Sequence, residues 1–401
     1  MDMVADGRVK KGCFIPFKEH AFSLKVNGYA TLSRLFHFLI RLFDWRRRVN
    51  ERQGRAIIDV AFISNFREEN GDVLYAGYGG KYRKYLPAVS QWTRIYFRNM
   101  STMLFVVGST AKEVLGGAHG KQRARNQFLS AVEESIQDGA RVVLFASALK
   151  RLWSEQTFRK EVFPKYGDRI LFTIGDNLTS IILCKEIERV IRMTGLKRPR
   201  VLVIGPSGFL GGEATTYLLS NGYETLGLAA SNERVTATAE RFGIRIHTDF
   251  REVGMVDLVV AASHFDSVRL TSENIDLIRR PEKKLVVIDP SEPYNLDKET
   301  YRVCRKKVIR VDVNAYSSEL RFVLGWIASR NLRLTPGSLW ACFCEAIILR
   351  AEMESDTDVS ETDWMSVNKK AKAILLKYYD KYFGLAPTPL CFGKPISDFN
   401  V

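Results

Sequence analysis

Short apolar runs alternate with amphipathic stretches along the second half of the chain. Each apolar run has the length and the β-branched composition of a buried strand, and the stretches between the runs fit helices. Strands are predicted at residues 201–204, 224–230, 256–261, 284–289 and 308–311. Strands and helices that alternate in this way predict an α/β fold with a parallel, doubly wound sheet.

The first half of the chain has the same mixed character. Strands are predicted at residues 56–64, 73–75, 103–107 and 141–145, a hairpin-like turn at 69–72, a glycine-rich loop at 77–80 that leads into a basic, aromatic run at 81–85, and a helix at 122–137. We therefore expect an N-terminal α/β domain in addition to the doubly wound one.

Residues 195–199, Gly-Leu-Lys-Arg-Pro, have the composition of a linker. They divide the chain into an N-terminal α/β substrate domain at residues 1–195, a nucleotide-binding domain at 196–334 and a C-terminal helical segment at 335–401. With 401 residues, 46% of them hydrophobic, the chain is long enough to bury the cores of two or three such units.

Three evenly spaced glycines follow the strand predicted at residues 201–204 and precede a helix expected from residue 213. Gly205 lets the chain turn off the strand, Gly208 leaves room for a pyrophosphate, and Gly211 lets helix and strand pack closely. The helix N-terminus adds unpaired N–H groups and a positive dipole. A plain structural turn is the alternative. We expect a Rossmann-type dinucleotide site made of Gly205, Ser207, Gly208, Phe209, Leu210 and Gly211.

The end of the next strand bears on the choice of nicotinamide cofactor. An NAD site places an acidic residue there to hold the ribose hydroxyls, but this strand runs into two alanines and Ser231. Ser231, Asn232 and Arg234 are suited instead to a 2′-phosphate. The sequence therefore favours NADP.

Polar residues also follow three other predicted strands, at residues 171–173, 256–261 and 284–289. Ser263, His264 and Asp289 lie at carboxyl ends of strands, where sheets of this class bind ligands, so we expect Ser263 and Asp289 to contact the cofactor. His264 is a candidate catalytic residue that would orient a substrate carbonyl, or it only caps a loop. Thr179 follows the loop at residues 175–177, which would aim hydroxyl and amide groups at substrate or nicotinamide, or would only cap a helix that links two domains.

Basic residues are concentrated in the first half of the chain. Residues 1–200 contain 35 Lys and Arg and 19 Asp and Glu, and the whole chain has a net charge of +15. Such an excess indicates an acidic partner, which would be nucleic acid, anionic lipid or an acidic carrier protein, or it is only a solvated surface. Residues 32–48 predict an amphipathic helix with a basic stripe, laid on the core or docked peripherally on a membrane or an acidic partner.

The cysteine and hydropathy patterns predict a cytoplasmic location. No apolar run approaches the roughly 18 residues that a membrane span needs, and the first residues lack the apolar core of a secretory signal. The six cysteines are scattered and show no C-x-x-C spacing, so we expect reduced thiols and no metal site.

The last long helix is predicted to start at residues 335–338 and to be buried, because it is apolar nearly all round to residue 349. Cys342 and Cys344 lie early in it. A helix N-terminus or a nearby cation lowers the pKa of a thiol, which makes the thiol a better nucleophile at neutral pH. The alternative is that each cysteine is a small core residue.

Four stretches together resemble the long-chain acyl-(acyl-carrier-protein) reductases of the cyanobacterial type. They are residues 173–179 (TIGDNLT), 205–211 (GPSGFLG), 288–291 (IDPS) and above all 340–349 (WACFCEAIIL). The resemblance extends with gaps from about residue 120 to residue 369, and the cysteine-helix stretch is its most specific part.

This resemblance implies that the protein reduces a long-chain fatty acyl thioester to a fatty aldehyde with NADPH. It implies an acyl intermediate on Cys342, with Cys344 as the alternative thiol. The implied partners are acyl carrier protein or acyl coenzyme A, which would meet the basic first half, and an enzyme that consumes the aldehyde. No nucleic acid partner is expected.

Two other classes stay open at the level of sequence. One is a different Rossmann dehydrogenase, of the shikimate dehydrogenase or glutamyl-tRNA reductase type, and an RNA partner of the latter would suit the basic half. The other is a non-catalytic NADP-binding protein.

Overall fold

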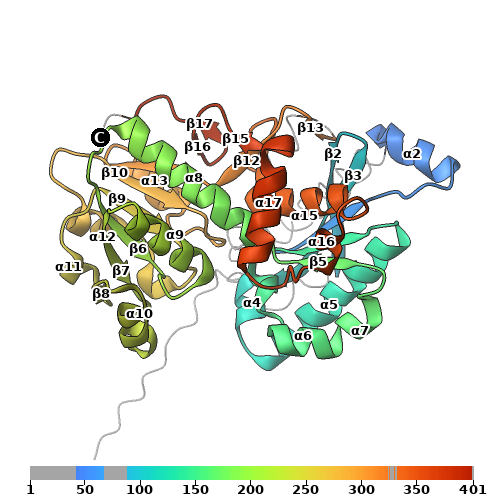
Figure 1. Ribbon diagram of the computed structural model, residues 1–401, viewed down its shortest axis with the longest axis horizontal. Coiled ribbons are helices and arrows are strands. Elements are labelled where there is room, and N and C mark those ends of the chain that lie inside the picture. The colour runs from blue at the N-terminus through green and yellow to red at the C-terminus, as the bar shows by residue number, and fades with distance from the viewer. Residues whose placement is uncertain (1–41, 67–87, 324, 326–328, 330–331, 400–401) are drawn as a thin grey trace, which may run out of the picture.

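Two six-stranded sheets form the framework of the protein (Figure 1). The computed structural model describes residues 42–66, 88–323, 325, 329 and 332–399. The turn, strand, glycine-rich loop and basic run predicted between residues 69 and 85 lie outside this part of the chain, as does most of the helix predicted at 32–48. Among the described residues, no helix is long and apolar enough to cross a bilayer.

The first sheet has the order β13-β2-β3-β1-β4-β5. Its strands are β1 (Val60–Phe66), β2 (Val89–Phe97), β3 (Met100–Thr110), β4 (Val142–Phe145), β5 (Leu171–Thr173) and β13 (Leu320–Phe322). The four strands from β3 to β5 are parallel, and β2 and β13 extend the sheet in antiparallel fashion. The predicted strand at residues 103–107 is thus the middle of a longer strand.

The second sheet has the order β11-β10-β9-β6-β7-β8, with every neighbouring pair parallel. Its strands are β6 (Arg200–Ile204), β7 (Glu224–Leu228), β8 (Ile246–His247), β9 (Leu258–Ala261), β10 (Leu285–Asp289) and β11 (Val308–Asp312). The chain passes from β8 at one edge to β9 beside β6 in the middle, which is the Rossmann arrangement. The predicted doubly wound sheet is confirmed.

Each sheet is buried on both faces, as parallel sheets require. In β6, Val201 and Val203 pack in the core that includes α8 and α9, whereas Leu202 and Ile204 pack in a separate core with α11 and α12. The helices that follow β5 are α8 (Asp176–Thr194), α9 (Phe209–Ser220), α10 (Val235–Phe242), α11 (Phe250–Val253), α12 (Ser272–Ile278) and α13 (Lys298–Cys304). The predicted helix from residue 213 therefore begins at Phe209, directly after the glycine turn.

A single hydrophobic core joins the two sheets. It contains one face of each sheet together with α8 and the C-terminal helices α15 and α17, and Figure 1 shows these helices near the centre of the molecule. The C-terminal elements are α15 (Ala341–Glu352), α16 (Thr357–Glu361), α17 (Lys369–Tyr382), β15 (Gly384–Leu385), β16 (Leu390–Cys391) and β17 (Lys394–Pro395). The expectation that the cysteine helix is buried is confirmed.

The cysteine helix begins later than predicted. Residues Ser338–Trp340 form strand β14, which pairs with β12 (Asn314–Tyr316), and α15 starts at Ala341. Gly337 has a φ of +83°, which a right-handed helix does not allow. The helix start predicted at residues 335–338 was wrong, because a right-handed helix cannot pass through the left-handed Gly337.

The predicted domain limit at residue 334 does not coincide with the end of the second sheet. The last strand of that sheet, β11, ends at Asp312, and β13 pairs with β2 of the first sheet. Pairing over more than 200 positions leaves no local signal in the sequence, so the return of the chain to the first sheet was missed.

The helices on the other face of the first sheet are mostly short. They are α4 (Ala111–Leu115), α5 (Ala118–Gln137), α6 (Glu155–Glu161) and α7 (Phe163–Tyr166), preceded by α2 (Trp45–Arg52). The helix predicted at 32–48 is described only from residue 42. In this part, Asp44 is the N-cap of α2, and its buried side chain forms an ion pair with Arg94. A single helix through residue 48 is therefore wrong at Asp44, whose side chain caps a new helix.

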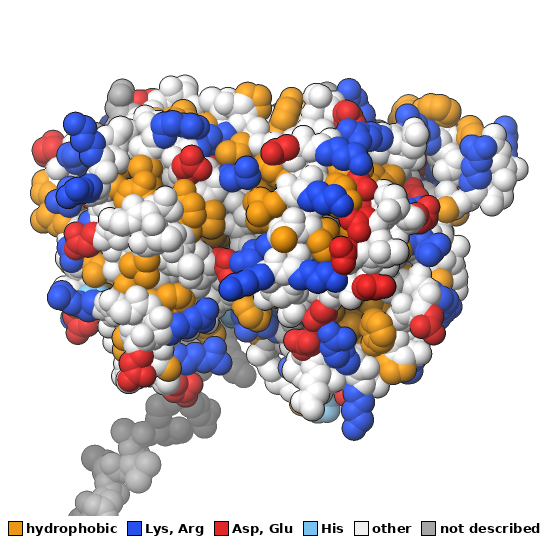
Figure 2. All heavy atoms as spheres, viewed as in Figure 1, with side chains coloured by type: hydrophobic (Ala, Val, Ile, Leu, Met, Phe, Trp, Pro, Cys, Tyr) orange, Lys and Arg blue, Asp and Glu red, His pale blue; other side chains and the backbone are white. Residues whose placement is uncertain are grey.

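Charged side chains are spread over the surface shown in Figure 2. Lys and Arg side chains lie over both halves of this face and alternate with Asp and Glu, and hydrophobic side chains lie between them. The basic side chains of the described residues are therefore not gathered into one patch on this face.

Candidate active site

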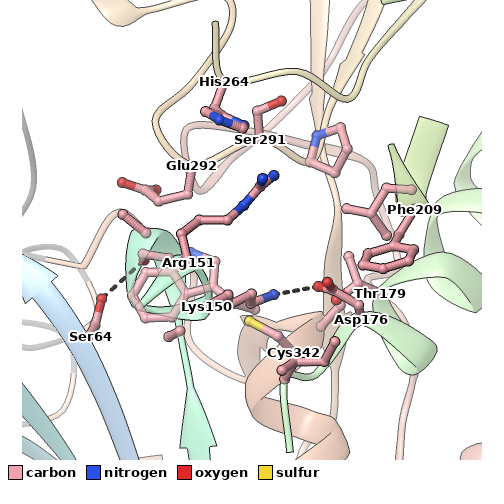
Figure 3. Close-up of a pocket in the computed structure, with 18 of the residues that line it drawn as sticks. Ser64, Lys150, Arg151, Asp176, Thr179, Phe209, His264, Ser291, Glu292 and Cys342 are labelled. Atoms are coloured by element: carbon pink, nitrogen blue, oxygen red, sulfur yellow. Dashed lines mark hydrogen bonds and ion pairs between the residues drawn. The ribbon is translucent and has the colours of Figure 1, made fainter. Parts of the chain in front are cut away.

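A cavity of about 650 Å³ lies between the carboxyl ends of the two sheets. The first sheet contributes the segments after β4 and β5, and the second contributes the glycine turn after β6 and the segments after β9 and β10. The start of α15, in the C-terminal segment, forms a further wall of the cavity. Figure 3 shows side chains from all of these elements pointing into one space.

The two cysteines of α15 have different surroundings. Cys342, the second residue of the helix, lines the cavity, whereas Cys344 is fully buried in the core and does not line it. Burial raises the pKa of the Cys342 thiol to about 12 and that of the Cys344 thiol well above its usual range. Of these two thiols, Cys342 is the one that a ligand in the cavity can reach.

Gly175 holds the start of α8 directly against Cys342. It has a φ of +72°, and a Cβ atom built there would lie 2.7 Å from the Cys342 Cα atom and 2.8 Å from its carbonyl oxygen. A side chain at this position would therefore strain the backbone and collide with the cysteine. The loop and N-cap signal at residues 175–177 thus reflects a close contact between α8 and α15.

Hydrogen bonds around Glu345 reinforce this contact. The Glu345 carboxylate accepts from the Thr173 hydroxyl and from the Leu178 N–H at 2.7 Å, and Gly175 N–H donates to Thr173 Oγ1 at 3.0 Å. Burial raises the pKa of Glu345 to about 7. Thr179, which also lines the cavity, donates to the Gly175 carbonyl at 2.7 Å, so its hydroxyl proton is used within the protein.

Lys150 is a site residue that the sequence analysis did not identify. It lies in η2 (Ser147–Arg151), immediately after β4, and forms an ion pair with Asp176 at the start of α8 (Figure 3). The Ala148 N–H donates to Asn65 Oδ1 at 2.9 Å, which fixes η2 to the end of β1. The one sequence signal was the position of Lys150 after a buried strand, where parallel sheets collect functional side chains.

The glycine turn has the geometry that the sequence predicted. Gly205 has a φ of +81°, and a Cβ atom on Gly211 would lie 2.7 Å from the Gly205 carbonyl carbon. These two glycines shape the turn. Ser207, Gly208, Phe209 and Leu210, at the N-terminus of α9, line the cavity.

The residues predicted at the ends of β9 and β10 reach the same cavity. Ser263, His264 and Asp289 all line it. Burial and the nearby Arg151 guanidinium lower the pKa of His264, so the imidazole is neutral near pH 7. Asp289 is buried, and its carboxylate accepts from the N–H groups of Ser291 and Leu296 at 3.1 and 3.0 Å. This carboxylate is engaged within the protein, and its predicted role in binding a cofactor stays a prediction.

The residues predicted to recognise a 2′-phosphate lie on the surface beyond β7. Ser231, Asn232 and Arg234 are exposed, and of these three Arg234 lines the cavity. Within the described part of the chain, no ion pair is seen for Arg234. Its guanidinium is thus available to an anion at the edge of the cavity.

No protein-family model matches the sequence, and no curated protein sequence matches it. Among solved structures, the chain is similar to L-tryptophan dehydrogenase from Nostoc punctiforme, with 10% identity and a TM-score of 0.39 over 81% of this chain and 83% of that one. It is also similar to shikimate dehydrogenase from Aquifex aeolicus (15% identity, TM-score 0.34, 77% and 97% covered). The nucleotide-binding domain of glutamyl-tRNA reductase from Thermoplasma volcanium is a further match (18% identity, TM-score 0.24, 33% and 84% covered). At these identities and scores, the likenesses assign neither a substrate nor a reaction to the chain.

Proposed function

We propose that the protein is an NADPH-dependent reductase that converts a long-chain fatty acyl thioester to a fatty aldehyde through an acyl group on Cys342. The observation that carries this proposal is that Cys342 and the N-terminus of α9 line one cavity. A nucleophilic sulfur and a dinucleotide-binding turn can then act on the same bound group.

The glycine turn fits a nicotinamide dinucleotide. Gly205 and Gly211 bring α9 against β6, and the first residues of α9 line the cavity, where their N–H groups would hold the pyrophosphate. Arg234 would hold the 2′-phosphate of NADPH, and no carboxylate ends β7 to favour NAD. Bound there, NADPH would supply the hydride for the reduction.

The other side of the cavity suits an acyl chain. Its apolar lining includes Trp92, Leu104 and Val106 of the first sheet, together with Leu115, Leu332 and Trp340. An apolar chain buried there would gain about 0.8 kcal/mol for each CH₂ group removed from water. Cys342 lines the same cavity as these apolar side chains and the glycine turn, as a group passed from an acyl donor to a reductant requires.

The partners are part of the same proposal. The excess of Lys and Arg in residues 1–200 would attract acyl carrier protein, which is acidic, or the phosphates of acyl coenzyme A. This chemistry best fits a cytoplasmic enzyme that contacts the membrane peripherally near residues 32–48. The enzyme would pass its aldehyde to a second enzyme that consumes it.

Replacement of Gly211 by alanine is expected to weaken NADPH binding by at least about tenfold, equivalent to about 1.4 kcal/mol. The new Cβ would meet the backbone of Gly205 and push α9 away from the turn. Titration of the protein fluorescence with NADPH and with NADH measures the effect. Gly212→Ala is the matched control, since its nearest atom would be the Pro206 carbonyl oxygen at 3.5 Å. Equal NADPH affinity in the two variants would contradict a cofactor site at this turn.

Mass spectrometry of the protein after incubation with an acyl donor, without cofactor, tests the proposed function most directly. A mass increase equal to the acyl group, on the peptide that contains Cys342 and labile to hydroxylamine, is the expected result. Acyl carrier protein thioesters, acyl coenzyme A and glutamyl-tRNA are supplied in separate reactions, followed by NADPH. If glutamyl-tRNA alone modified the protein, the proposed substrate class would be wrong. If an acyl donor oxidised NADPH without any modification of the protein, the acyl-enzyme would be excluded.

A further inference from the structure

Lys150 is the cation that faces Cys342 inside the cavity. The two residues and Asp176 come from three different elements, η2, α15 and α8, and all three line the same space. Figure 3 shows the Lys150 ammonium between the Asp176 carboxylate and the Cys342 sulfur, with a dashed line to Asp176. The ion pair is therefore not a surface contact, because it lies where the proposed reaction would occur.

The groups around Cys342 have opposing effects on the pKa of its thiol. Burial is the largest effect and raises the pKa of the thiol, while Lys150 is the strongest influence that lowers it. The Asp176 and Glu345 carboxylates raise the pKa, and the Phe343 N–H lowers it. The resting thiol is thus protonated at neutral pH, and it needs a proton acceptor and a cation before it can attack.

Lys150 stays charged in this setting. Burial disfavours its ammonium, but Asp176, Cys342 and Glu345 together raise the pKa of Lys150 above its usual value. A charged lysine can stabilise a thiolate and donate a proton, although it cannot accept one. Asp176, whose carboxylate is its ion-pair partner, can accept one.

We propose that Lys150 and Asp176 form a proton-relay pair for Cys342. As the sulfur bonds to the thioester carbonyl carbon, Lys150 passes a proton to the Asp176 carboxylate and takes up the thiol proton, so its ammonium is charged again beside the developing negative charge. When the bond from that carbon to the donor sulfur breaks, Lys150 gives its proton to the donor thiolate. The proton on Asp176 then returns to Lys150, so the net change is one proton moved from Cys342 to the donor thiol. This inference rests on the acyl transfer proposed above.

The rival explanation is that the ion pair only holds η2 against the start of α8. The two explanations differ in what happens to the reactivity of the thiol, which can be measured without any acyl donor. Iodoacetamide reacts with the thiolate form of cysteine, so its rate at Cys342, followed by peptide mass spectrometry from pH 7 to 10, reports the thiolate fraction.

Lys150→Met is expected to slow alkylation of Cys342 at pH 8 by about tenfold or more, which corresponds to a rise of one pKa unit. Lys150→Arg keeps the positive charge and should remain within about threefold of the parent. Lys160→Met, which removes an exposed lysine from α6, is the control and should not change the rate. If Lys150→Met does not fold by circular dichroism, Lys150→Gln, which keeps a hydrogen bond to Asp176, replaces it.

The outcomes separate this inference from the proposed function. Slower alkylation in the neutral variants, with rescue by arginine, supports the relay pair. Alkylation at the parental rate in Lys150→Met or Lys150→Gln overturns it, even if the parent carries an acyl group on Cys342. A parent protein that is alkylated as expected but never carries an acyl group overturns the proposed function, and the relay with it.

Discussion

Replacement of Cys342 by alanine is expected to lower kcat/KM for the acyl thioester by at least about 10⁴-fold, with no acyl group retained on the protein. Cys342 is the thiol of α15 that lines the cavity. Without it, the donor must react directly with the reductant, which forfeits both the covalent intermediate and its fixed position. NADPH oxidation in the presence of acyl donor measures the loss.

Cys344→Ala is the matched control for this prediction. Cys344 lies in the same helix but is fully buried and does not reach the cavity, so its removal should leave kcat/KM within a few fold of the parent. NADPH binding should be unchanged in both variants, because neither cysteine belongs to the glycine turn. Full activity in Cys342→Ala, or loss of activity confined to Cys344→Ala, would refute the role given to Cys342.

Replacement of Gly175 by alanine is expected to reduce the reductase activity by about 100-fold or more, since a displacement of about 1 Å at a reacting group has an effect of that size. The new Cβ would overlap the backbone of Cys342, so either α8 or the start of α15 must move. The variant should also be less stable, because alanine in the left-handed region costs about 1–2 kcal/mol. Urea unfolding and NADPH oxidation are the two measurements.

Gly195, at the other end of the same helix, provides the control. It has a φ of +68°, close to the +72° of Gly175, and no atom lies within 4 Å of the position where its Cβ would be. Gly195→Ala should therefore show the left-handed strain alone, with lower stability and normal activity. If both variants lose activity equally, the contact between Gly175 and Cys342 is not what positions the nucleophile.

The pattern of neighbouring residues was sufficient to predict much of the second sheet and the glycine turn. The strands of the second sheet are short apolar runs, and the glycine turn needs its residue types within seven positions, so both leave a mark in neighbouring residues. The structure agrees with these predictions because a buried parallel strand and a left-handed turn each constrain the chain locally. The start of α15 shows the limit, since a left-handed Gly337 and the pairing of β14 with β12 moved it to Ala341.

The choice between the two thiols shows what local pattern does not contain. Cys342 and Cys344 share one helix and one apolar segment, but residues two apart on a helix point in nearly opposite directions. Which of them meets a cavity depends on what packs around the helix. Cys344 belongs to the core that joins the two sheets, whereas Cys342 lines the cavity.

Periodicity and glycine spacing act over a few residues, so the doubly wound sheet, the glycine turn and the buried cysteine helix could be predicted from the sequence. Long-range packing places β13 in the first sheet, Gly175 against Cys342 and Lys150 beside Asp176. These contacts join residues that are far apart in the chain, and their energies depend on burial and distance, which no short stretch of sequence specifies.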